Sequence, residues 1–217
     1  VAANSPKYVF LFIGDGMATP QISAAEAYLG ELDDEEVDIE QLSFTQFPAQ
    51  GMTTTYANDR YITGSAAAGT AMASGEKTNI GVVGMDATKT VELPTIAELA
   101  KDAGMKVGIV SSVDIDHATP AAFYAHVPAR GQYYEIGLQM ANSDFDYFGG
   151  GRVRISKTPE GKPTVLEVMR DKGWTVVENK EEFLNLEQDG SQVYAYNYGF
   201  SSDALKYAID RDEDDIS

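Results

Sequence analysis

The feature that most constrains the fold is an unbroken apolar run near the start of the chain. It covers Lys7–Ile13 and ends abruptly at Gly14-Asp15-Gly16. An apolar stretch of this length is typical of a strand buried on both faces of a parallel sheet. We therefore expect a central strand with Asp15 at its carboxyl end, the edge where open α/β sheets bind ligands. Turn aspartates are also common after strands without any function, so both interpretations of Asp15 stay open.

Strand and helix patterns alternate along the rest of the chain. Helices are expected where apolar residues recur every three or four positions, at 19–29, 65–74, 94–103, 133–140, 163–171, from 179 and from 201. Further strands are expected at 50–56, 106–110, 146–152, 174–177 and 192–196. With 217 residues, 43% of them hydrophobic, the chain has enough apolar surface for a substantial core. The alternation predicts an α/β fold around one sheet.

Charge and composition limit the partners of the chain. It has 34 acidic and 16 basic residues and a net charge of −18, which argues against nucleic acid and anionic membranes. The same charge repels an anionic substrate, so a phosphate site would need a local positive source such as metal ions. Cysteine is absent, which excludes disulfides and thiolate metal sites. The start at Val1 is compatible with cleavage of a signal peptide or with a shortened chain.

A serine at the start of a small-residue segment is the first candidate for chemistry. The segment 60–75 predicts a loop that leads into a helix at Ser65. A helix start offers free N–H groups and a positive dipole end, so an anion beside the Ser65 hydroxyl would be stabilised. Alternatively, Ser65 is a simple N-cap worth about 1 kcal/mol. The glycine-flanked elbow of serine hydrolases is absent, because Thr63 and Ala67 stand at its glycine positions.

Two further motifs follow the expected strand at 106–110. The first, Asp116-His-Ala-Thr-Pro120, offers oxygen and nitrogen ligands close together, although such sequences also form ordinary turns. The second is His126-x3-Arg130, in which Arg130 is suited to bind two phosphate oxygens at once or is simply a surface arginine. Other glycine-rich segments lack the spacing of a P-loop or a dinucleotide fingerprint. Each motif alone is weak evidence for a site.

Taken in order, these motifs resemble the alkaline phosphatase family from about Tyr8 to Gly151. The resemblance implies a doubly wound, mostly parallel sheet with helices on both faces. Residues 1–217 would be the N-terminal part of a single catalytic domain, and so an incomplete fold. It also implies hydrolysis of phosphate monoesters through a phosphoserine intermediate, at two zinc ions and a third metal, usually magnesium. A homodimeric full-length protein in the periplasm or secreted is expected.

The same resemblance assigns roles to individual residues. Ser65 matches the nucleophile, which also lies beside a metal. Asp15 matches the carboxylate that bridges the second zinc and the third metal. His117 and Thr119 match positions at the third metal, and Arg130 matches the arginine that binds the substrate phosphate.

The sequence departs from the family pattern at two of these places. Many members have aspartate before the nucleophile, where this chain has Gly64, so we expect Arg130 to be less tethered and phosphate to be held more weakly. His117 stands where some members have aspartate. A nitrogen ligand there should shift the third site from magnesium toward softer divalent metals.

The ligand set within these 217 residues is incomplete. A zinc pair needs three or four ligands for each metal, and only His117 and His126 supply imidazole. The family's other ligands come from the part of the sheet that follows, so we expect this chain alone to be inactive or nearly so. The alternative is a non-catalytic module that binds phosphate or nucleotides at its helix starts.

Overall fold

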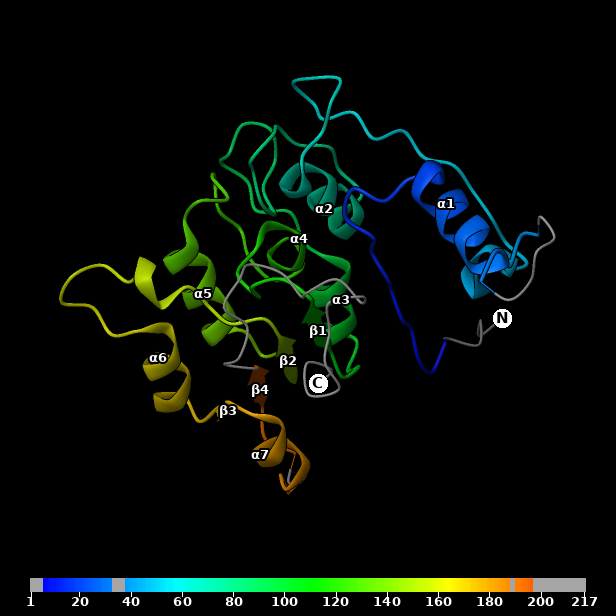
Figure 1. Ribbon diagram of the computed structural model, residues 1–217. Coiled ribbons are helices and arrows are strands. Elements are labelled where there is room, and N and C mark those ends of the chain that lie inside the picture. The colour runs from blue at the N-terminus through cyan, green and yellow to red at the C-terminus, as the bar shows by residue number, and fades with distance from the viewer. Residues whose placement is uncertain (1–5, 33–37, 188–189, 197–217) are drawn as a thin grey trace, which may run out of the picture. The chain divides into compact units, whose positions relative to one another are not determined.

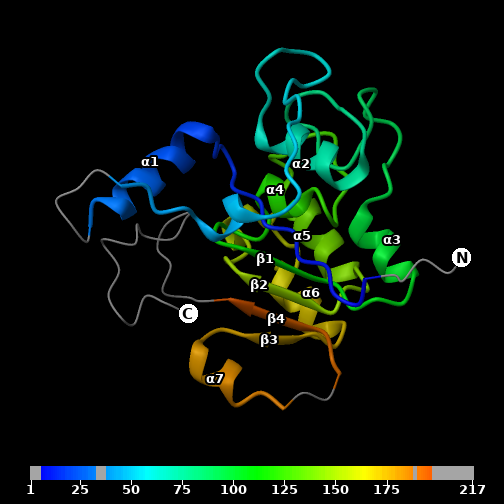
Figure 2. The same ribbon diagram turned by 90° about the vertical axis from the view of Figure 1, so that its right-hand side faces the viewer.

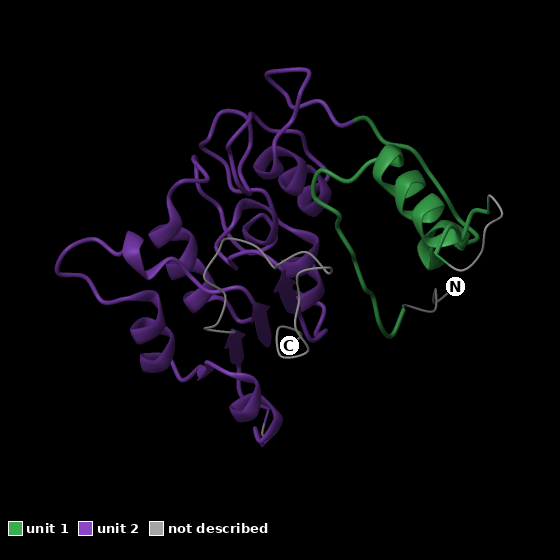
Figure 3. Cartoon of the chain, in the orientation of Figure 1, with its two compact units in different colours: residues 1–54 green, residues 55–217 purple. Residues whose placement is uncertain are grey.

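The computed structural model describes residues 6–32, 38–187 and 190–196. The helix expected from Ser201 lies outside these residues. The chain divides into two compact units, residues 1–54 and 55–217 (Figure 3), each of which is described by itself. The expectation that the chain is part of one catalytic domain stays a prediction.

The described part of the first unit contains one long helix and one short turn of 3₁₀ helix. The helix is α1 (Thr19–Gly30) and the 3₁₀ helix is η1 (Ser43–Gln46). The helix forms as expected, with Pro20 in its first turn, where a missing N–H costs no hydrogen bond. Glu26 joins the two elements, because its carboxylate accepts the backbone N–H of Leu42 at 3.0 Å and the hydroxyl of Thr45 at 2.6 Å.

The expected strands at 7–13 and 50–56 do not form, so these two predictions are wrong. Residues 8–14 have no regular secondary structure (the coil before α1 in Figure 1), and Phe10 and Phe12 are 78% and 90% exposed. Met52 in the second segment is fully exposed. A strand is stabilised by the hydrogen bonds and side chains of a neighbouring strand. Within the described residues these two runs have no such neighbour, and apolar composition alone does not supply one.

The second unit is built around a four-stranded parallel sheet in the order β1-β2-β4-β3 (Figure 2). Its strands are β1 (Gly108–Ser111), β2 (Tyr147–Gly150), β3 (Thr175–Val177) and β4 (Val193–Tyr196). Ser111, Gly150 and Tyr196, the last residues of β1, β2 and β4, are in register, and Val177 at the end of β3 pairs with Ala195 one residue earlier. The carboxyl ends of these strands therefore lie together along one edge, and the predicted parallel α/β fold is confirmed.

In the described part of the second unit, two helices precede β1 and the others connect the strands of the sheet. They are α2 (Ser65–Ser74), α3 (Ile96–Asp102), α4 (Ala118–Ala121), α5 (Tyr133–Asn142), η2 (Ile155–Lys157), α6 (Val165–Asp171) and α7 (Lys180–Leu184). Three of them start where a side chain accepts the N–H of the third helical residue, at Thr95, Thr164 and Asn179. Gly75 and Gly104 follow α2 and α3 in the left-handed conformation that ends a helix.

An aromatic cluster forms the core beside β2. Phe148 is fully buried, and its ring lies 5.1 Å from that of Tyr124, 5.6 Å from Trp174 and 6.0 Å from Phe145. The outer strand β1 is less covered than its apolar sequence predicts, since Val110 is 69% exposed. The predicted apolar stripe of α3 is likewise exposed at Ile96 and Leu99, and the helix buries Ala97 instead.

Candidate active site

The candidate nucleophile is the first residue of α2. The residue before it, Gly64, is the N-cap and carries no side chain, so the interpretation of Ser65 as a simple N-cap is wrong. Ser65 is half-buried. Its position at the helix start confirms the local structure predicted from the sequence, where backbone N–H groups and the helix dipole favour an anion.

Small residues let α2 lie close to α4, the helix that carries Thr119. At Gly69 an added Cβ would be 3.0 Å from the Cβ of Ala122 and 3.6 Å from the backbone of Thr119. The first distance is tighter than an ordinary contact and the second is an ordinary van der Waals contact, so a side chain at position 69 would press on Ala122. The small-residue run therefore brings the helix of Ser65 against the helix of Thr119.

The loop after α2 is fixed from the helix side. The buried hydroxyl of Thr70 accepts the N–H of Gly84 at 2.9 Å and lies 3.4 Å from the carbonyl of Val82. Gly84 has a φ of 59°, and a Cβ there would be 2.1 Å from the carbonyl oxygen of Ala125. The glycine is thus required by a close approach of two backbones.

Two of the predicted site residues are in contact. The Nη2 of Arg130 lies 3.3 Å from Nε2 of His117, which is the N-cap of α4. A guanidinium can only donate hydrogen bonds, so Nε2 is the acceptor. The backbone N–H of Arg130 donates to the carbonyl of Gly81 at 2.7 Å, which anchors the arginine to the loop after α2, the glycine-rich loop of residues 75–85.

The two aspartates before His117 are bound by an arginine that the sequence analysis did not identify. Asp114 and Asp116 are 3% and 1% exposed. The guanidinium of Arg154 pairs with Asp116 and lies 3.1 Å from Asp114. Burial raises the pKa of Asp116 to about 6, although hydrogen bonds from Arg154 oppose the rise. The prediction that Asp116 offers metal ligands is therefore not supported, since its carboxylate is occupied by Arg154.

His126 also has a structural role. Its Nδ1 lies 2.7 Å from the carbonyl of Gly84, and its Nε2 lies 2.9 Å from a carboxylate oxygen of Glu98. Burial lowers the pKa of His126, but these two hydrogen bonds outweigh burial and raise it. Since both ring nitrogens have partners within unit 2, His126 has no lone pair available for a metal.

Asp15 belongs to the first unit. It is exposed and lies in a turn closed by the N–H of Met17 and the carbonyl of Gly14 at 3.1 Å. Gly16 has a φ of 70°, which accounts for the glycine after Asp15. The role of Asp15 as a metal ligand stays a prediction.

The described residues do not themselves fit a zinc or magnesium site. No three histidine, aspartate or glutamate side chains among them could hold a metal ion. In the second unit the predicted ligands are Ser65, His117 and Thr119, and the two carboxylates just before His117 are engaged by Arg154. One imidazole and two neutral hydroxyls are not the ligand set of either metal, since zinc takes thiolate, imidazole and carboxylate ligands and magnesium is held through carboxylates.

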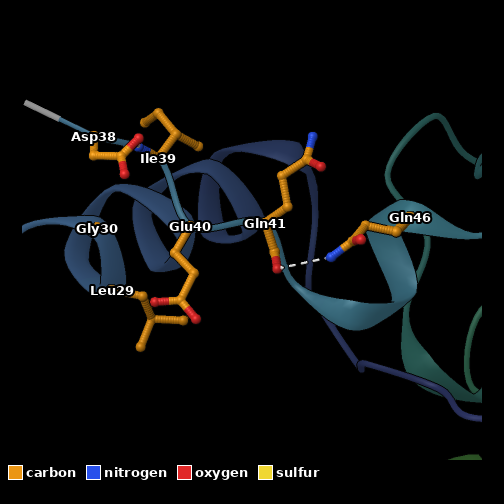
Figure 4. Close-up of a pocket in the computed structure, with 7 residues that line it drawn as sticks. All are labelled: Leu29, Gly30, Asp38, Ile39, Glu40, Gln41 and Gln46. Carbon is orange, nitrogen blue, oxygen red and sulfur yellow. Dashed lines mark hydrogen bonds between the residues drawn. The ribbon is translucent and has the colours of Figure 1, made fainter.

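A cavity of about 600 Å³ lies within the first unit, at the C-terminal end of α1 (Figure 4). It is lined by Leu29, Gly30, Asp38, Ile39, Glu40, Gln41 and Gln46. Across its wall the side chain of Gln46 donates to the carbonyl of Gln41 at 3.2 Å. None of the predicted site residues lines this cavity, so it carries no support for the predicted chemistry.

Fold and site together define an α/β protein in which His117 follows a strand of the parallel sheet, contacts Arg130, and begins the helix that packs against the helix of Ser65. A family model described as alkaline phosphatase matches residues 6–216, and the chain belongs to this family. Alkaline phosphatase 4 of Drosophila melanogaster is 40% identical over 129 residues, which are 56% of this chain and 22% of that protein. The tissue-nonspecific isozyme of Homo sapiens is 36% identical over 139 residues, 60% of this chain and 26% of that protein.

Solved structures of alkaline phosphatases are also similar to this chain. The chain is similar to a cold-active alkaline phosphatase from Shewanella sp., with a TM-score of 0.74 and 33% identity over 92% of this chain and 47% of that chain. It is also similar to the alkaline phosphatase of the Antarctic bacterium TAB5, with a TM-score of 0.70 and 28% identity over 84% of this chain and 50% of that one. The chain thus spans about a quarter of the first curated relatives and about half of these solved structures.

Proposed function

We propose that this chain carries the nucleophile and the phosphate-binding arginine of a phosphomonoesterase. One observation carries the proposal. Ser65 begins a helix that packs against α4, and the N-cap of α4, His117, contacts Arg130. Membership of the alkaline phosphatase family supports the reaction class.

The reaction we propose is a double displacement at phosphorus. The Ser65 oxygen attacks the phosphorus atom, the bond to the ester oxygen breaks, and the alcohol leaves with the proton that the serine loses. Water then hydrolyses the phosphoserine, which restores the hydroxyl and releases inorganic phosphate. The start of α2 and the two-pronged guanidinium of Arg130 stabilise the negative charge of the phosphoryl group.

Metal ions complete the proposal. Some family relatives are described with magnesium bound, among them a TAB5 mutant in which glutamate replaces a histidine. We assign zinc and magnesium to this protein, with contributions from Asp15, Ser65, His117 and Thr119 and with further ligands from outside the described residues. His117 would bind a metal through Nε2 only when Arg130 releases that nitrogen. When bound, such metals supply the positive charge that favours a serine alkoxide and that a chain of net charge −18 lacks. His117 in the third site favours a softer metal than magnesium.

Membership of the same family also supports proposals for the oligomeric state, the location and the substrates of the protein. We propose that this chain alone is inactive or nearly so, and that the full-length protein is a homodimer located in the periplasm or secreted. No helix within the described ranges has the length and apolar character needed to cross a membrane. Small phosphate monoesters are the proposed substrates.

The test is hydrolysis of p-nitrophenyl phosphate at alkaline pH with added zinc and magnesium. It compares this chain with the natural full-length protein and with its Ser65→Ala variant. We expect activity only in the full-length protein and a loss of about 10⁴-fold or more in the variant, as for other nucleophiles. Ser74→Ala, at the other end of α2, is the matched control. A Ser65→Ala variant that keeps its activity would mean that Ser65 is not the nucleophile. A native protein that binds phosphate but neither hydrolyses the ester nor forms phosphoserine after rapid acid quenching would be a binding module.

A further inference from the structure

Two loops at the carboxyl edge of the sheet are joined by several hydrogen bonds. One loop follows β1 and leads to His117, and the other follows β2 and leads to Arg154. The N–H of Gly151 donates to the carbonyl of Ser111 at 3.2 Å, and the N–H of Ile115 donates to the carbonyl of Arg152 at 3.2 Å. The parallel pairing of β1 with β2 places these loops side by side, because Ser111 and Gly150 are partners in register.

Arg154 is the centre of this junction. Its backbone N–H donates to Asp116 at 2.7 Å, and its guanidinium binds Asp116 and Asp114 with different nitrogens. The ring of Tyr133 covers the guanidinium, with its centroid 4.3 Å from Cζ. The arginine side chain is only 14% exposed, so both carboxylates and their cation are withdrawn from water.

The bound aspartates lie directly before the residues of the site. The carbonyl of Asp114 accepts the N–H of His117 at 2.9 Å and so closes the turn that presents the imidazole. Within the same turn, the carbonyl of Ile115 accepts a hydrogen bond from the hydroxyl of Tyr124 at 2.6 Å. A continuous set of contacts therefore runs from Arg154 through this turn to His117, and from His117 to Arg130.

Stability alone does not explain a buried cluster of this kind. Desolvation of buried charges largely cancels their attraction, and neutral groups of similar size often serve as well or better. What the charged cluster adds is a fixed geometry, since the fork of one guanidinium fits two carboxylates in a single arrangement. We infer that Arg154 is a positioning residue, which sets His117 and through it Arg130 in the arrangement that binds phosphate. This inference rests on the proposed function of Arg130.

The experiment replaces the cluster by neutral groups in the full-length protein. A triple variant, Arg154→Met with Asp114→Asn and Asp116→Asn, leaves no charge unpaired and keeps an acceptor for the N–H of residue 154. Thermal unfolding and the dissociation constant for inorganic phosphate are measured. We expect an unfolding temperature close to that of the native protein and a phosphate affinity lower by about tenfold or more, because small displacements of binding groups have large effects. Native phosphate affinity in the folded variant would overturn the inference.

Two further variants make the result decisive. Arg154→Lys keeps the positive charge but loses the planar guanidinium that binds both carboxylates. The variant should therefore fold, but its affinity for phosphate should be several-fold lower than that of the native protein. It serves as the test if the triple variant does not fold. Lys101→Met removes a cation 2.7 Å from Asp146 at the amino ends of the same strands and should leave phosphate affinity unchanged. An equal loss in this control would show a general effect of ion-pair removal and would overturn the inference.

A failure of the proposed function is recognised separately. If the native protein neither binds phosphate nor hydrolyses esters, the proposed function is wrong. A crystal structure of the folded variant then decides the inference through the distance between His117 Nε2 and Arg130 Nη2, which is 3.3 Å with Arg154 in place. An unchanged distance contradicts a positioning role, and a clear separation supports it.

Discussion

Two segments of this chain share a sequence pattern but not a structure. Each begins with a lysine and an apolar run and continues into a turn with aspartate, at Lys7–Met17 and at Lys106–His117. The second contains β1, and its turn is buried and bound by Arg154. The first has no strand, and its turn at Asp15 is exposed.

The difference shows what an apolar run needs in order to become a strand. The segment of β1 is held at its start by Asp146, whose carboxylate accepts the N–H of Val107 at 2.9 Å and pairs with Lys106 at 2.7 Å. Its end is held by the loop of Arg154. These partners lie about 40 residues away in the sequence, and they come into reach because β2 pairs with β1. The local pattern is thus a necessary condition for the strand, whereas the distant partner is what forms it.

The largest effect is expected from a pair of phenylalanine truncations, one in each region. Phe148→Ala should lower the free energy of unfolding by roughly 3–5 kcal/mol, because it empties a fully buried site between three aromatic rings. Phe12→Ala, at a side chain that is 90% exposed, should change it by less than about 0.5 kcal/mol. Denaturant unfolding of both variants measures the contrast. A cost of several kcal/mol for Phe12→Ala would mean that the first segment is buried in the protein after all.

The contrast between these two segments also shows how much of this fold can be predicted from the sequence alone. Strands 106–110, 146–152, 174–177 and 192–196 were predictable, because turn residues bound each run and each finds a parallel neighbour. The strand at 7–13 was not, since the presence of a partner cannot be deduced from a single run. The predicted burial of the apolar stripe of α3 failed for a similar reason, because periodicity identifies an apolar stripe but not the element that would cover it.

The site was predictable to a different extent. Ser65, His117 and Arg130 belong to short motifs, and the structure puts two of them in contact. Arg154 belongs to no motif, and its hydrogen bonds to Asp116 span 38 positions of sequence. One signal was available, because two aspartates in an apolar segment require a cation if they are buried. The sequence does not tell which of the 16 basic residues supplies it.

The second prediction concerns the turn aspartate of the first segment. If Asp15 binds metal, Asp15→Asn should lower kcat/KM by about 100-fold and weaken metal binding, as expected for loss of a ligand or of its support. Its exposure predicts an almost unchanged unfolding temperature. Kinetics of the full-length protein and calorimetric metal titration measure both quantities. Asp144→Asn, at an exposed acid of the second unit, is the control for the lost charge, and equal kinetics in the two variants would make Asp15 a simple turn residue.

A smaller effect is expected at Gly64, which precedes the nucleophile. Its φ of −136° suits any residue, and an added Cβ would lie 3.3 Å from a side-chain carbon of Ile80, which must move by a few tenths of an ångström. Gly64→Asp should therefore fold and, by tethering Arg130, strengthen inhibition by inorganic phosphate several-fold. Gly64→Ala adds the same Cβ without the carboxylate and should not. Unchanged inhibition by phosphate in Gly64→Asp would contradict the tethering hypothesis.

The smallest effect is expected on the pH dependence of the free energy of unfolding. It tests whether the ion pair between His126 and Glu98 stabilises the second unit. Hydrogen bonds to Glu98 and to the carbonyl of Gly84 outweigh burial and raise the pKa of His126 in the folded protein, with a further contribution from the charge of Glu92. A raised pKa means that the folded state binds the proton more tightly than the unfolded state. The stabilisation is then complete at a pH below the pKa of His126 in the unfolded state, and it is lost as the pH rises through the pKa of His126 in the folded state. Glu98 is partly exposed, so screening limits the effect to about 1 kcal/mol or less.

The variant Glu98→Gln isolates this contribution. Its amide can donate to a neutral His126, so the imidazole no longer needs the extra proton, and the remaining amide oxygen can still accept the N–H of Thr95, which Glu98 accepts at 2.8 Å. Unfolding measured from mildly acidic to alkaline pH should show the native protein losing its advantage over the variant as pH rises. Curves that stay parallel would mean that His126 is neutral throughout. The link to Gly84 would then hold the glycine-rich loop through a neutral hydrogen bond, and the anchor of Arg130 at Gly81 would be independent of pH.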